Sequence, residues 1–410
     1  MKELTIIGAG LGPETLSVEG LEALQTAEVW FGAKRLLELY HAIRGEKQAF
    51  PYYRGKTILQ EIEQSSALRF VVLVSGDPGF YSAASTLVKE VTEYNPGIIL
   101  RVIPGISSLN AFFARLGKPW ENAAIVSAHG RETSAVAGEF VTLVRRNRYT
   151  FCLAGTNAGV LGEALCVAGF GPDFKPLKIH VGENLGDPGE KVYALDADAL
   201  AHASFPELTV LLAENENPDD RVLHGIADSA FIRAEGIPMT KAAVRSFCLS
   251  QLALGSGETV WDIGAGSGSV TVEMALAVFS GRVFAVEKKE TAIALIRENC
   301  RNFHIGNVKV VQGEAPDVLA ELPSPDAVFI GGSGGSANLE GIIAAARTRN
   351  PQARIVATAA TIETASTLLS ALPTCSLFQI SAAEGRRAGK NHLLIAQNPV
   401  MIISDTGQEA

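Results

Sequence analysis

Hydrophobic and polar positions follow two different periods along the second half of the chain. Short apolar runs, such as 258–264, 282–287 and 326–332, end in glycine or an acidic residue and predict strands that are buried on both faces. The segments between them, such as 269–279 and 290–303, carry apolar residues at helical spacing. Three further apolar runs predict strands at 308–315, 354–360 and 391–403. Repeated strand–helix units of this kind predict an α/β fold in which helices cover both faces of a parallel sheet.

The first half of the chain also alternates between apolar runs and segments with helical spacing. Its strands are predicted at 4–12, 29–32, 69–82, 98–108 and 149–157, and glycine or proline lies at the end of each run. We expect this half to contain two sub-lobes that divide near residues 110–120.

A polar stretch that contains Pro218 separates the two halves. After it, Thr240 is predicted to cap the next helix, and Gly255 is predicted to end that helix. The sequence therefore predicts a first domain over residues 1–215, a linker over 216–235 and a second domain over 236–410.

Composition and charge narrow the range of partners. The 410 residues include 35 Lys and Arg and 44 Asp and Glu, for a net charge of −9. Because no basic stripe is present, we do not expect nucleic acid as a partner. The five cysteines are scattered without a CxxC pair, so neither a metal site nor a disulfide framework is expected, and a reducing cytoplasm fits. No apolar run reaches the roughly 20 residues that would span a bilayer, so no membrane association is expected.

A glycine-rich turn in the second half is the strongest candidate for a cofactor site. The motif consists of Gly264, Ala265, Gly266, Ser267 and Gly268, and it ends one predicted strand and opens the next helix. Glycines allow the backbone to approach a ligand closely, and a helix N-terminus adds unpaired N–H groups. Glu287 ends the next strand, where its carboxylate can accept hydrogen bonds from both hydroxyls of a ribose. Glu314 ends the third strand and could reach an adenine edge. A nucleotide-like cofactor is therefore predicted, although plain turn glycines would give the same pattern.

Three loops of the first half carry weaker signals. The stretch 8–17 repeats the GxGxG pattern, but no acidic residue ends the strand that follows it. Gly76 and Asp77 lie in a Gly-Asp-Pro turn, which places a carboxylate on a rigid loop or simply forms an Asx turn. Ser107 and Ser108 either contact a ligand or cap the next helix.

Two clusters of cationic side chains are candidate sites for anions. His129 and Arg131 flank a glycine after a predicted strand. Arg386, Arg387 and Lys390 gather in a short stretch of the second half, where a solvated loop is the alternative interpretation. Arginine suits carboxylates because its planar fork can donate to both oxygens.

These motifs together resemble known methyltransferases. In the first half, the stretches IIGAGLGPETLS, SGDPGFYS, PGISSLNAFFARLGKPW and SAHGRE resemble the tetrapyrrole methyltransferase family, in its cobalamin-pathway carbon-5 branch. In the second half, GIPMTKAAVRSFCLSQL, WDIGAGSGSVTVE and FIGGSGG resemble the cobalamin-pathway carbon-15 methyltransferases and decarboxylases. The order of the two sets is that of a family of fused enzymes.

The resemblance implies a fold and a cofactor for each half. It implies a bilobal class III tetrapyrrole-methyltransferase fold for the first half and a Rossmann-like class I fold for the second, with one S-adenosylmethionine (SAM) per domain. In the first half SAM would lie near Gly76, Asp77 and the Ser107–Ser108 turn. In the second half its contacts would include Thr240, residues 264–268, Glu287 and Ala315. Glu314 departs from the family, in which aspartate is common at this position.

The resemblance also implies an activity. It is methylation of carbons 5 and 15 of a precorrin with decarboxylation of the acetate at carbon 12, in corrin-ring biosynthesis. The tetrapyrrole carboxylates would contact His129 and Arg131 in the first domain and Arg386, Arg387 and Lys390 in the second. The family makes a homo-oligomer the expected assembly.

Several alternatives stay open at this point. An NAD-dependent oxidoreductase is disfavoured because its fingerprint is GxGxxG. A non-catalytic protein that binds SAM or a tetrapyrrole is a second alternative. The sequence does not distinguish a metal-free precorrin from its cobalt counterpart, and it identifies no acid for the decarboxylation.

Overall fold

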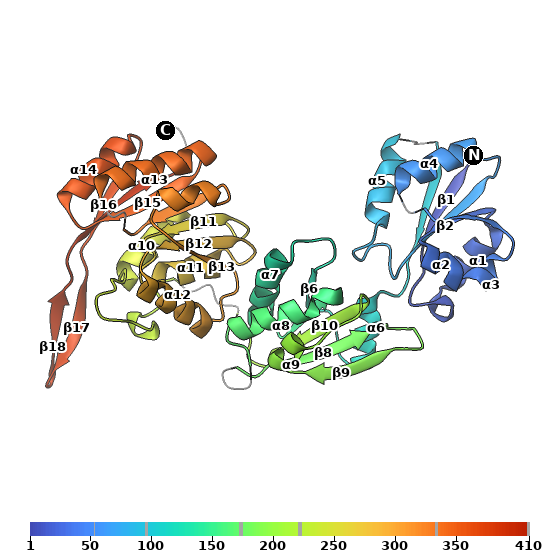
Figure 1. The fold of residues 1–410 in the computed structure, drawn as a ribbon, viewed down its shortest axis with the longest axis horizontal. Coiled ribbons are helices and arrows are strands. Elements are labelled where there is room, and N and C mark those ends of the chain that lie inside the picture. The colour runs from blue at the N-terminus through green and yellow to red at the C-terminus, as the bar shows by residue number, and fades with distance from the viewer. Residues whose placement is uncertain (53, 95–96, 172–174, 220–223, 333–334, 408–410) are drawn as a thin grey trace.

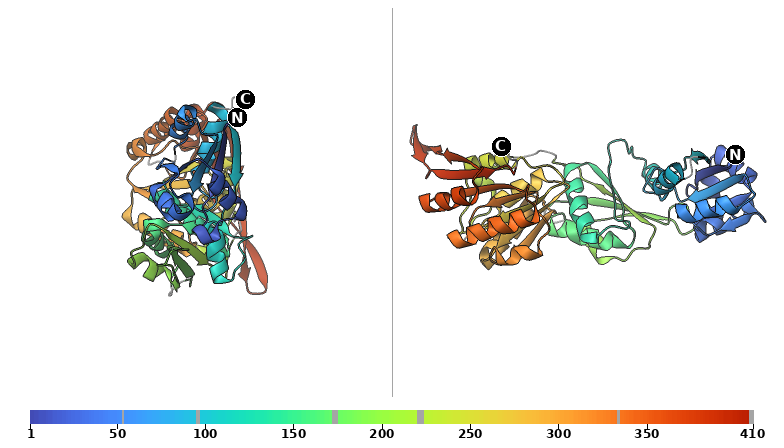
Figure 2. Two further views of the ribbon diagram at one scale, coloured as in Figure 1. Left: turned by 90° about the vertical axis from the view of Figure 1, so that its right-hand side faces the viewer. Right: turned by 90° about the horizontal axis from the view of Figure 1, so that it is seen from above.

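Three α/β bodies follow one another along the chain and along the long axis of the molecule (Figures 1 and 2). The computed structural model describes the whole chain except residues 53, 95–96, 172–174, 220–223, 333–334 and 408–410. The first body lies at one end, the second in the middle, and the third, with the C-terminus, at the other end.

The first body contains a five-stranded sheet in the order β3-β2-β4-β1-β5, and all of its strand pairs are parallel. The strands are β1 (Glu3–Gly8), β2 (Val29–Gly32), β3 (Gln48–Phe50), β4 (Arg69–Val74) and β5 (Ile99–Ile103). The helices are α1 (Val18–Thr26), α2 (Lys34–Leu39), α3 (His41–Arg44), α4 (Gly55–Gln64) and α5 (Ala84–Tyr94). The central strands β1 and β4 are buried along most of their length because hydrophobic clusters pack on both faces of the sheet.

The second body contains a mixed five-stranded sheet in the order β6-β7-β10-β8-β9. Its strands are β6 (Ala124–Ser127), β7 (Tyr149–Leu153), β8 (Lys178–Glu183), β9 (Lys191–Leu195) and β10 (Thr209–Glu214). Its helices are α6 (Ser108–Leu116), α7 (Thr133–Arg146), α8 (Ala158–Val167) and α9 (Ala197–His202). The chain passes from the first sheet to the second between β5 and β6. The division near 110–120 and the domain limits remain predictions.

The third body contains a seven-stranded sheet in the order β13-β12-β11-β14-β15-β19-β16. Its strands are β11 (Thr259–Ile263), β12 (Arg282–Glu287), β13 (Val308–Gln312), β14 (Ala327–Ile330), β15 (Arg354–Ala359), β16 (Ser376–Ile380) and β19 (Val400–Asp405). Its helices are α10 (Ala242–Leu252), α11 (Ser269–Ala277), α12 (Glu290–Asn302), α13 (Ser336–Arg349) and α14 (Ile362–Ala371). The strand order reverses direction at β11, and ligands of open α/β sheets bind beyond the strand ends at such a point. The α/β fold expected for this half is confirmed.

Two details of the third body differ from the predictions. Strand β19 runs antiparallel to both of its neighbours, so the sheet is not parallel throughout. The apolar run 391–403 is two strands instead of one. Its first part, β18 (Asn391–Ala396), pairs with β17 (Ala383–Ala388) in an exposed hairpin that projects from the body (Figure 1). Pro399 lies between β18 and β19, where its missing N–H suits a break in the pairing.

The predicted ends of helix α10 were wrong. The residue before the helix is Lys241, without a side-chain cap, and the Thr240 carbonyl instead accepts a hydrogen bond from Arg245. The helix ends before Gly255, because Ala253 adopts a left-handed conformation with φ 45° after Leu252. The position at which the helix begins therefore depends on tertiary contacts and not on a side-chain cap from Thr240.

The second and third bodies touch through a close backbone contact. A Cβ on Gly138 of α7 would lie 2.9 Å from the carbonyl oxygen of Gly306. A Cβ on Gly306 would lie 2.6 Å from the Cβ of Val141. Beside this contact, the rings of Phe170 and His304 lie 4.8 Å apart. Glycine at both positions therefore allows α7 to pack directly on the loop before β13.

Candidate functional site

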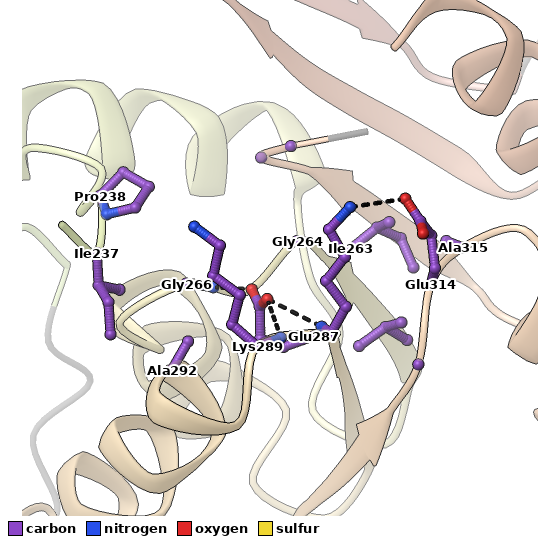
Figure 3. Close-up of a pocket in the computed structure, with 15 residues that line it drawn as sticks. Ile237, Pro238, Ile263, Gly264, Gly266, Glu287, Lys289, Ala292, Glu314 and Ala315 are labelled. Carbon is purple, nitrogen blue, oxygen red and sulfur yellow. Dashed lines mark hydrogen bonds and ion pairs between the residues drawn. The ribbon is translucent and has the colours of Figure 1, made fainter. Parts of the chain in front are cut away.

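A cavity of about 200 Å³ lies at the carboxyl ends of β11 and β12 (Figure 3). Its lining combines the glycine turn after β11 with loops that follow the neighbouring strands. It is lined by Ile237, Pro238, Ile263, Gly264, Gly266, Val286, Glu287, Lys288, Lys289, Ala292, Gly313, Glu314, Ala315, Gly331 and Gly332. The place matches the strand-order reversal at which a nucleotide-like ligand is expected.

The glycines of this cavity are required by its geometry. Gly264 has φ 71°, and a Cβ there would lie 2.4 Å from the Gly332 carbonyl oxygen. Gly266 has φ 55°, and a Cβ there would lie 2.9 Å from the Pro238 carbonyl oxygen. A Cβ on Gly332 would meet no atom within 4 Å. The missing side chain at Gly332 leaves space in which a ligand can lie against the backbone, so the lining suits SAM.

Glu287 connects the glycine turn to the end of β12. It is 9% exposed, and its Oε2 accepts a hydrogen bond of 3.0 Å from the Gly266 N–H. Its Oε1 accepts from the N–H groups of Lys288 and Lys289, both at 2.9 Å (Figure 3). These three backbone donors fix the carboxylate at the position from which we expect it to contact a ribose.

Glu314 is more exposed and is paired with a cation. Its Oε1 lies 2.8 Å from the Lys288 Nζ (Figure 3). About half of each side chain is exposed. The hydrogen bond from Lys288 to Glu314 raises the pKa of the Lys288 ammonium. Glu314 therefore lines the cavity as a partly exposed carboxylate paired with Lys288.

Asp262 is a buried carboxyl at the start of the glycine-rich motif, and the sequence analysis gave it no role in the site. Its side chain is fully buried, and burial raises its pKa to about 7. Its Oδ2 accepts a hydrogen bond from the Thr271 hydroxyl, whereas Oδ1 has no hydrogen-bond partner among the residues that the structure describes. The Ser267 hydroxyl is also buried, and none of the described residues forms a hydrogen bond with it. In the sequence, the position of this acidic residue two places before Gly264 was the feature that could have indicated a role in the site.

The other residues predicted for this site divide into two groups. Gly264, Gly266, Glu287, Glu314 and Ala315 line the cavity, whereas Thr240, Ala265, Ser267 and Gly268 do not belong to its described lining. A Cβ on Gly268 would lie 3.1 Å from the Ile296 Cα, so this glycine allows α11 and α12 to pack closely. The analysis missed Ile237 and Pro238, which come from the segment before α10.

A second cavity, of about 400 Å³, lies between the first and second bodies. One wall contains the loops after β1 and β4, and the other contains residues 207–210 at the start of β10. The predicted residues Gly76, Asp77, Ser107, Ser108 and His129 all line it. It is also lined by Gly10 and Leu11, from the GxGxG stretch that was judged the weaker motif.

Asp77 and Ser107 have structural roles as well as a place in this lining. The Asp77 Oδ1 accepts a hydrogen bond of 2.8 Å from the Gly79 N–H, which forms the Asx turn. Its Oδ2 accepts from the Gly105 N–H at 3.1 Å and so joins two loops of the cavity. Ser107 caps α6 by accepting from the Asn110 N–H. Both side chains therefore accept hydrogen bonds from backbone N–H groups and stabilise the loops that line the cavity.

Tyr81 is a residue of this cavity that the sequence did not reveal. Its φ is 46°, a conformation that bulky residues rarely adopt, and its side chain is 57% exposed. The ring packs edge-on against Phe80, with 5.2 Å between the ring centroids. Burial, followed by the charge of Glu139, raises the pKa of its hydroxyl. Unusual backbone conformations of this kind cluster at functional sites.

The predicted cations are less concentrated than the sequence indicated. Arg131 does not appear in the described lining of either cavity; it forms an ion pair of 2.6 Å with Glu139. Arg386, Arg387 and Lys390 lie exposed on the β17–β18 hairpin and its turn, outside both described linings.

The hairpin nevertheless extends from the edge of the sheet at which the first described cavity lies. It connects β16 to β19, and Ile380 at the end of β16 pairs with Val400 at the start of β19. Met401 pairs with Ala359, at the carboxyl end of β15. The hairpin therefore begins at the edge on which the first described cavity lies.

Two other kinds of feature are absent from the described residues. These residues contain no group of three or more His, Cys, Asp or Glu side chains that could hold a metal ion. No helix within the described ranges has both the length and the apolar character needed to cross a membrane.

Comparisons with known proteins assign the two halves to families. Residues 3–201 match the model of the tetrapyrrole (corrin/porphyrin) methylases, and residues 230–406 match that of the precorrin methyltransferase domain. A relative from Sinorhizobium sp, named precorrin-6Y C(5,15)-methyltransferase (decarboxylating), is 32% identical over 372 residues, which are 89% of this chain and 86% of the relative.

Two shorter proteins each match just under half of the chain. A relative from Pyrobaculum calidifontis, named "Probable cobalt-precorrin-6B C(15)-methyltransferase (decarboxylating)", is 45% identical over 44% of this chain and 94% of its own. The crystal structure of precorrin-6y C5,15-methyltransferase from Geobacter metallireducens is 36% identical, covers 45% of this chain and 97% of that chain, and has a TM-score of 0.42. Because the Sinorhizobium relative matches both halves in one alignment, the chain belongs to the family of decarboxylating precorrin-6Y C5,15-methyltransferases.

Proposed function

We propose that this chain uses SAM to methylate carbons 5 and 15 of a precorrin, or of its cobalt counterpart, and to decarboxylate the acetate at carbon 12 in corrin-ring synthesis. The observation that carries the proposal is the presence of two separate cavities in one chain, each beside the carboxyl ends of a different set of parallel strands. The first half would act at carbon 5 and the second at carbon 15.

The protein contributes mainly binding and orientation to such a reaction. SAM supplies an electrophilic methyl group on a sulfonium centre. In the second half, the Gly264 and Gly266 turn would hold the cofactor against the backbone, and Glu287 would accept hydrogen bonds from its ribose. The apolar residues Ile237, Pro238 and Ala292 would exclude water on the other side. In the first half, Gly76, Asp77, Ser107 and Ser108 are the proposed cofactor residues.

The number of SAM molecules bound tests the assignment of one cofactor to each half. Isothermal titration of the full chain should give two equivalents of SAM. Glu287→Ala should abolish or weaken binding at one site only, because Glu287 belongs to a single cavity. Glu298→Ala, at an exposed position of α12, is the control and should retain both sites. One equivalent in the unaltered protein, or loss of both sites in Glu287→Ala, would contradict the assignment.

Mass analysis of the product tests the activity itself. The purified chain is incubated with SAM and precorrin-6B, with and without cobalt in the macrocycle. The expected product carries two additional methyl groups and has lost one CO2. Binding of SAM and tetrapyrrole without turnover would instead support the non-catalytic alternative. Thermal stabilisation by NAD and not by SAM would support an oxidoreductase.

Cationic side chains are the proposed contacts for the substrate carboxylates. With a net charge of −9, the protein needs local positive charge to bind a polycarboxylate. We assign His129 and Arg131 to the first site and Arg386, Arg387 and Lys390 to the second. Arg387→Ala should weaken tetrapyrrole binding in calorimetry and leave SAM binding intact; unchanged tetrapyrrole affinity would remove the hairpin from the site.

A homo-oligomer is the proposed assembly. The exposed side chains of Leu393, Leu394 and Ile395 on the projecting hairpin support it, because an isolated two-stranded hairpin is at best marginally stable. Light scattering of the eluted protein should give a multiple of 43.3 kDa. A monomer mass at micromolar concentration would contradict this assembly.

A further inference from the structure

A fully buried ion pair lies behind the second-half cavity and does not line it. Arg245 of α10 and Glu273 of α11 are each 0% exposed, and the Arg245 Nε donates a hydrogen bond to Glu273. Asp228 completes the group, with its Oδ1 3.4 Å from an Arg245 nitrogen. We call these three residues the Arg245 cluster. Burial of two charges is costly in free energy unless other hydrogen bonds satisfy their remaining polar atoms.

The remaining hydrogen bonds of the cluster go to the two ends of one segment, residues 225–241. At its start, Glu273 accepts from the N–H groups of Gly225 and Ile226, at 2.8 and 2.9 Å. Arg245 donates to the carbonyl of Ile226 through one terminal nitrogen. At its end, the other terminal nitrogen donates to the carbonyl of Thr240 at 2.5 Å. A single guanidinium therefore fixes both ends of the segment.

Asp228 strengthens the attachment from within the segment. Its Oδ1 accepts from the N–H of Ala242 at 3.0 Å, at the first residue of α10. Its Oδ2 lies 3.5 Å from the Nζ of Lys241. The Arg245 guanidinium also lies over the Phe231 ring, 4.8 Å from its centroid. The segment is thus held from outside by Arg245 and Glu273 and from within by Asp228.

The middle of this segment forms a wall of the cavity. Ile237 and Pro238 line the cavity from a segment of the chain that is separate from the glycine turn (Figure 3). The Pro238 carbonyl oxygen would lie 2.9 Å from a Cβ on Gly266, so the wall lies directly against the turn. A small shift of the segment would change the width of the cavity where a cofactor would lie.

We propose that Arg245 is a positioning residue for SAM at the second site, a role that rests on the proposed function. It holds the wall of Ile237 and Pro238 against the glycine turn before the cofactor binds. The entropy cost of ordering the wall is then met when the protein folds and not when SAM binds. The affinity for SAM is higher for that reason. Arg245 itself touches neither the cofactor nor the reacting carbon.

The test compares variants of this cluster with a variant of an ion pair elsewhere in the same body. Asp228→Asn and Arg245→Lys should raise the Kd for SAM at the second site by tenfold or more. The Kd at the first site should not change. At saturating SAM, kcat for the carbon-15 step should stay within about twofold of the unaltered enzyme, because the defect is in the wall and not in the chemistry.

The control is Glu258→Gln, which breaks the pair of Glu258 with Arg354. That pair is partly buried and lies at the amino ends of β11 and β15, the opposite edge of the sheet from the cavity. It should lower the Tm without changing either Kd for SAM. If Asp228→Asn likewise lowers only the Tm, the cluster has a purely structural role and the proposal is overturned.

The outcomes separate this proposal from the proposed function. An unaltered chain that binds no SAM at the second site would refute the function. An unaltered chain with two sites, together with an Asp228→Asn variant of normal affinity, would refute only the positioning role. If Arg245→Lys does not fold, Asp228→Asn and Lys241→Met decide the question, because both side chains are partly exposed.

Discussion

Asp262 shows how one buried carboxyl makes stability depend on pH. Burial raises its pKa from 3.8 to about 7, so the native state binds its proton more tightly than the unfolded chain. The contribution of this group to stability is therefore largest below about pH 4 and is lost as the pH rises to about 7. In Asp262→Asn this loss should be absent, and the difference in Tm between variant and unaltered protein should change across pH 4–7. Asp317→Asn, at an exposed position, should follow the unaltered protein.

Tyr81 allows backbone conformation to be separated from the aromatic ring. Tyr81→Gly and Tyr81→Ala both remove the ring, but only glycine adopts φ 46° without strain. Tyr81→Gly should therefore be more stable than Tyr81→Ala by about 1 kcal/mol in urea unfolding. Both variants should show slower methylation at carbon 5 and unchanged methylation at carbon 15. Equal stabilities for the pair would show that the conformation is not strained.

The residues found from the sequence are those whose role depends on local chain geometry. Gly264 and Gly266 follow the end of β11, and Glu287 is the last residue of β12. Strand ends of this kind can be located from hydrophobic periodicity alone. Ile237 and Tyr81 reach their cavities through tertiary packing and φ values that no local pattern encodes. Thr240 resembled a helix cap, but Arg245, which is distant from solvent, engages its carbonyl instead.

At the scale of elements, Glu214 connects β10 to β8 and to the end of α6. It accepts from His180 at 3.0 Å and from Lys118 at 2.9 Å. Burial alone would raise the pKa of Glu214, but the hydrogen bonds from His180 and Lys118 outweigh it and lower the pKa to about 2. The ionised group therefore stabilises the fold above pH 4.5, and this contribution disappears as the pH falls to about 2.

Glu214→Gln should accordingly destabilise the protein by about 2 kcal/mol at pH 7. The loss should shrink as the pH is lowered from 4.5 toward 2, because the unaltered carboxylate becomes protonated there. Urea unfolding at pH 7 and pH 3 measures both values. Glu216→Gln, an exposed neighbour, should have little effect at either pH. A constant difference at the two pH values would argue against an ionised Glu214.

Three of the strands found from periodicity are buried on both faces. The runs that became β11, β12 and β14 are almost wholly buried, and their predicted limits agree with the structure within two residues. The run that became β18 is equally apolar but exposed at every position. Apolar character reports a tendency to be buried, not the partner that buries it. For that reason the hairpin could not be distinguished from a core strand.

At the scale of the whole molecule, the Gly138–Gly306 contact is one place where the second and third bodies pack directly on each other. Gly306→Ala would place a methyl group 2.6 Å from the Val141 Cβ, so the bodies should separate or tilt. Small-angle scattering should then give a larger radius of gyration, and each methylation should persist on its own. Gly189→Ala is the control, because a Cβ there would meet nothing within 4 Å. An unchanged radius would mean that the contact adjusts locally.

The first-half cavity has one wall on each of two sheets, and each sheet packs against its own hydrophobic core. The two bodies approach each other closely at Gly186, where a Cβ would lie 2.5 Å from the Leu11 Cβ. A ligand that touches both walls is bound only while both cores are intact. Unfolding of either lobe therefore loses the whole binding free energy of the ligand, so the bound ligand couples the unfolding of one lobe to the unfolding of the other. Two lobes that denature as separate cooperative units when empty should denature as a single unit when loaded.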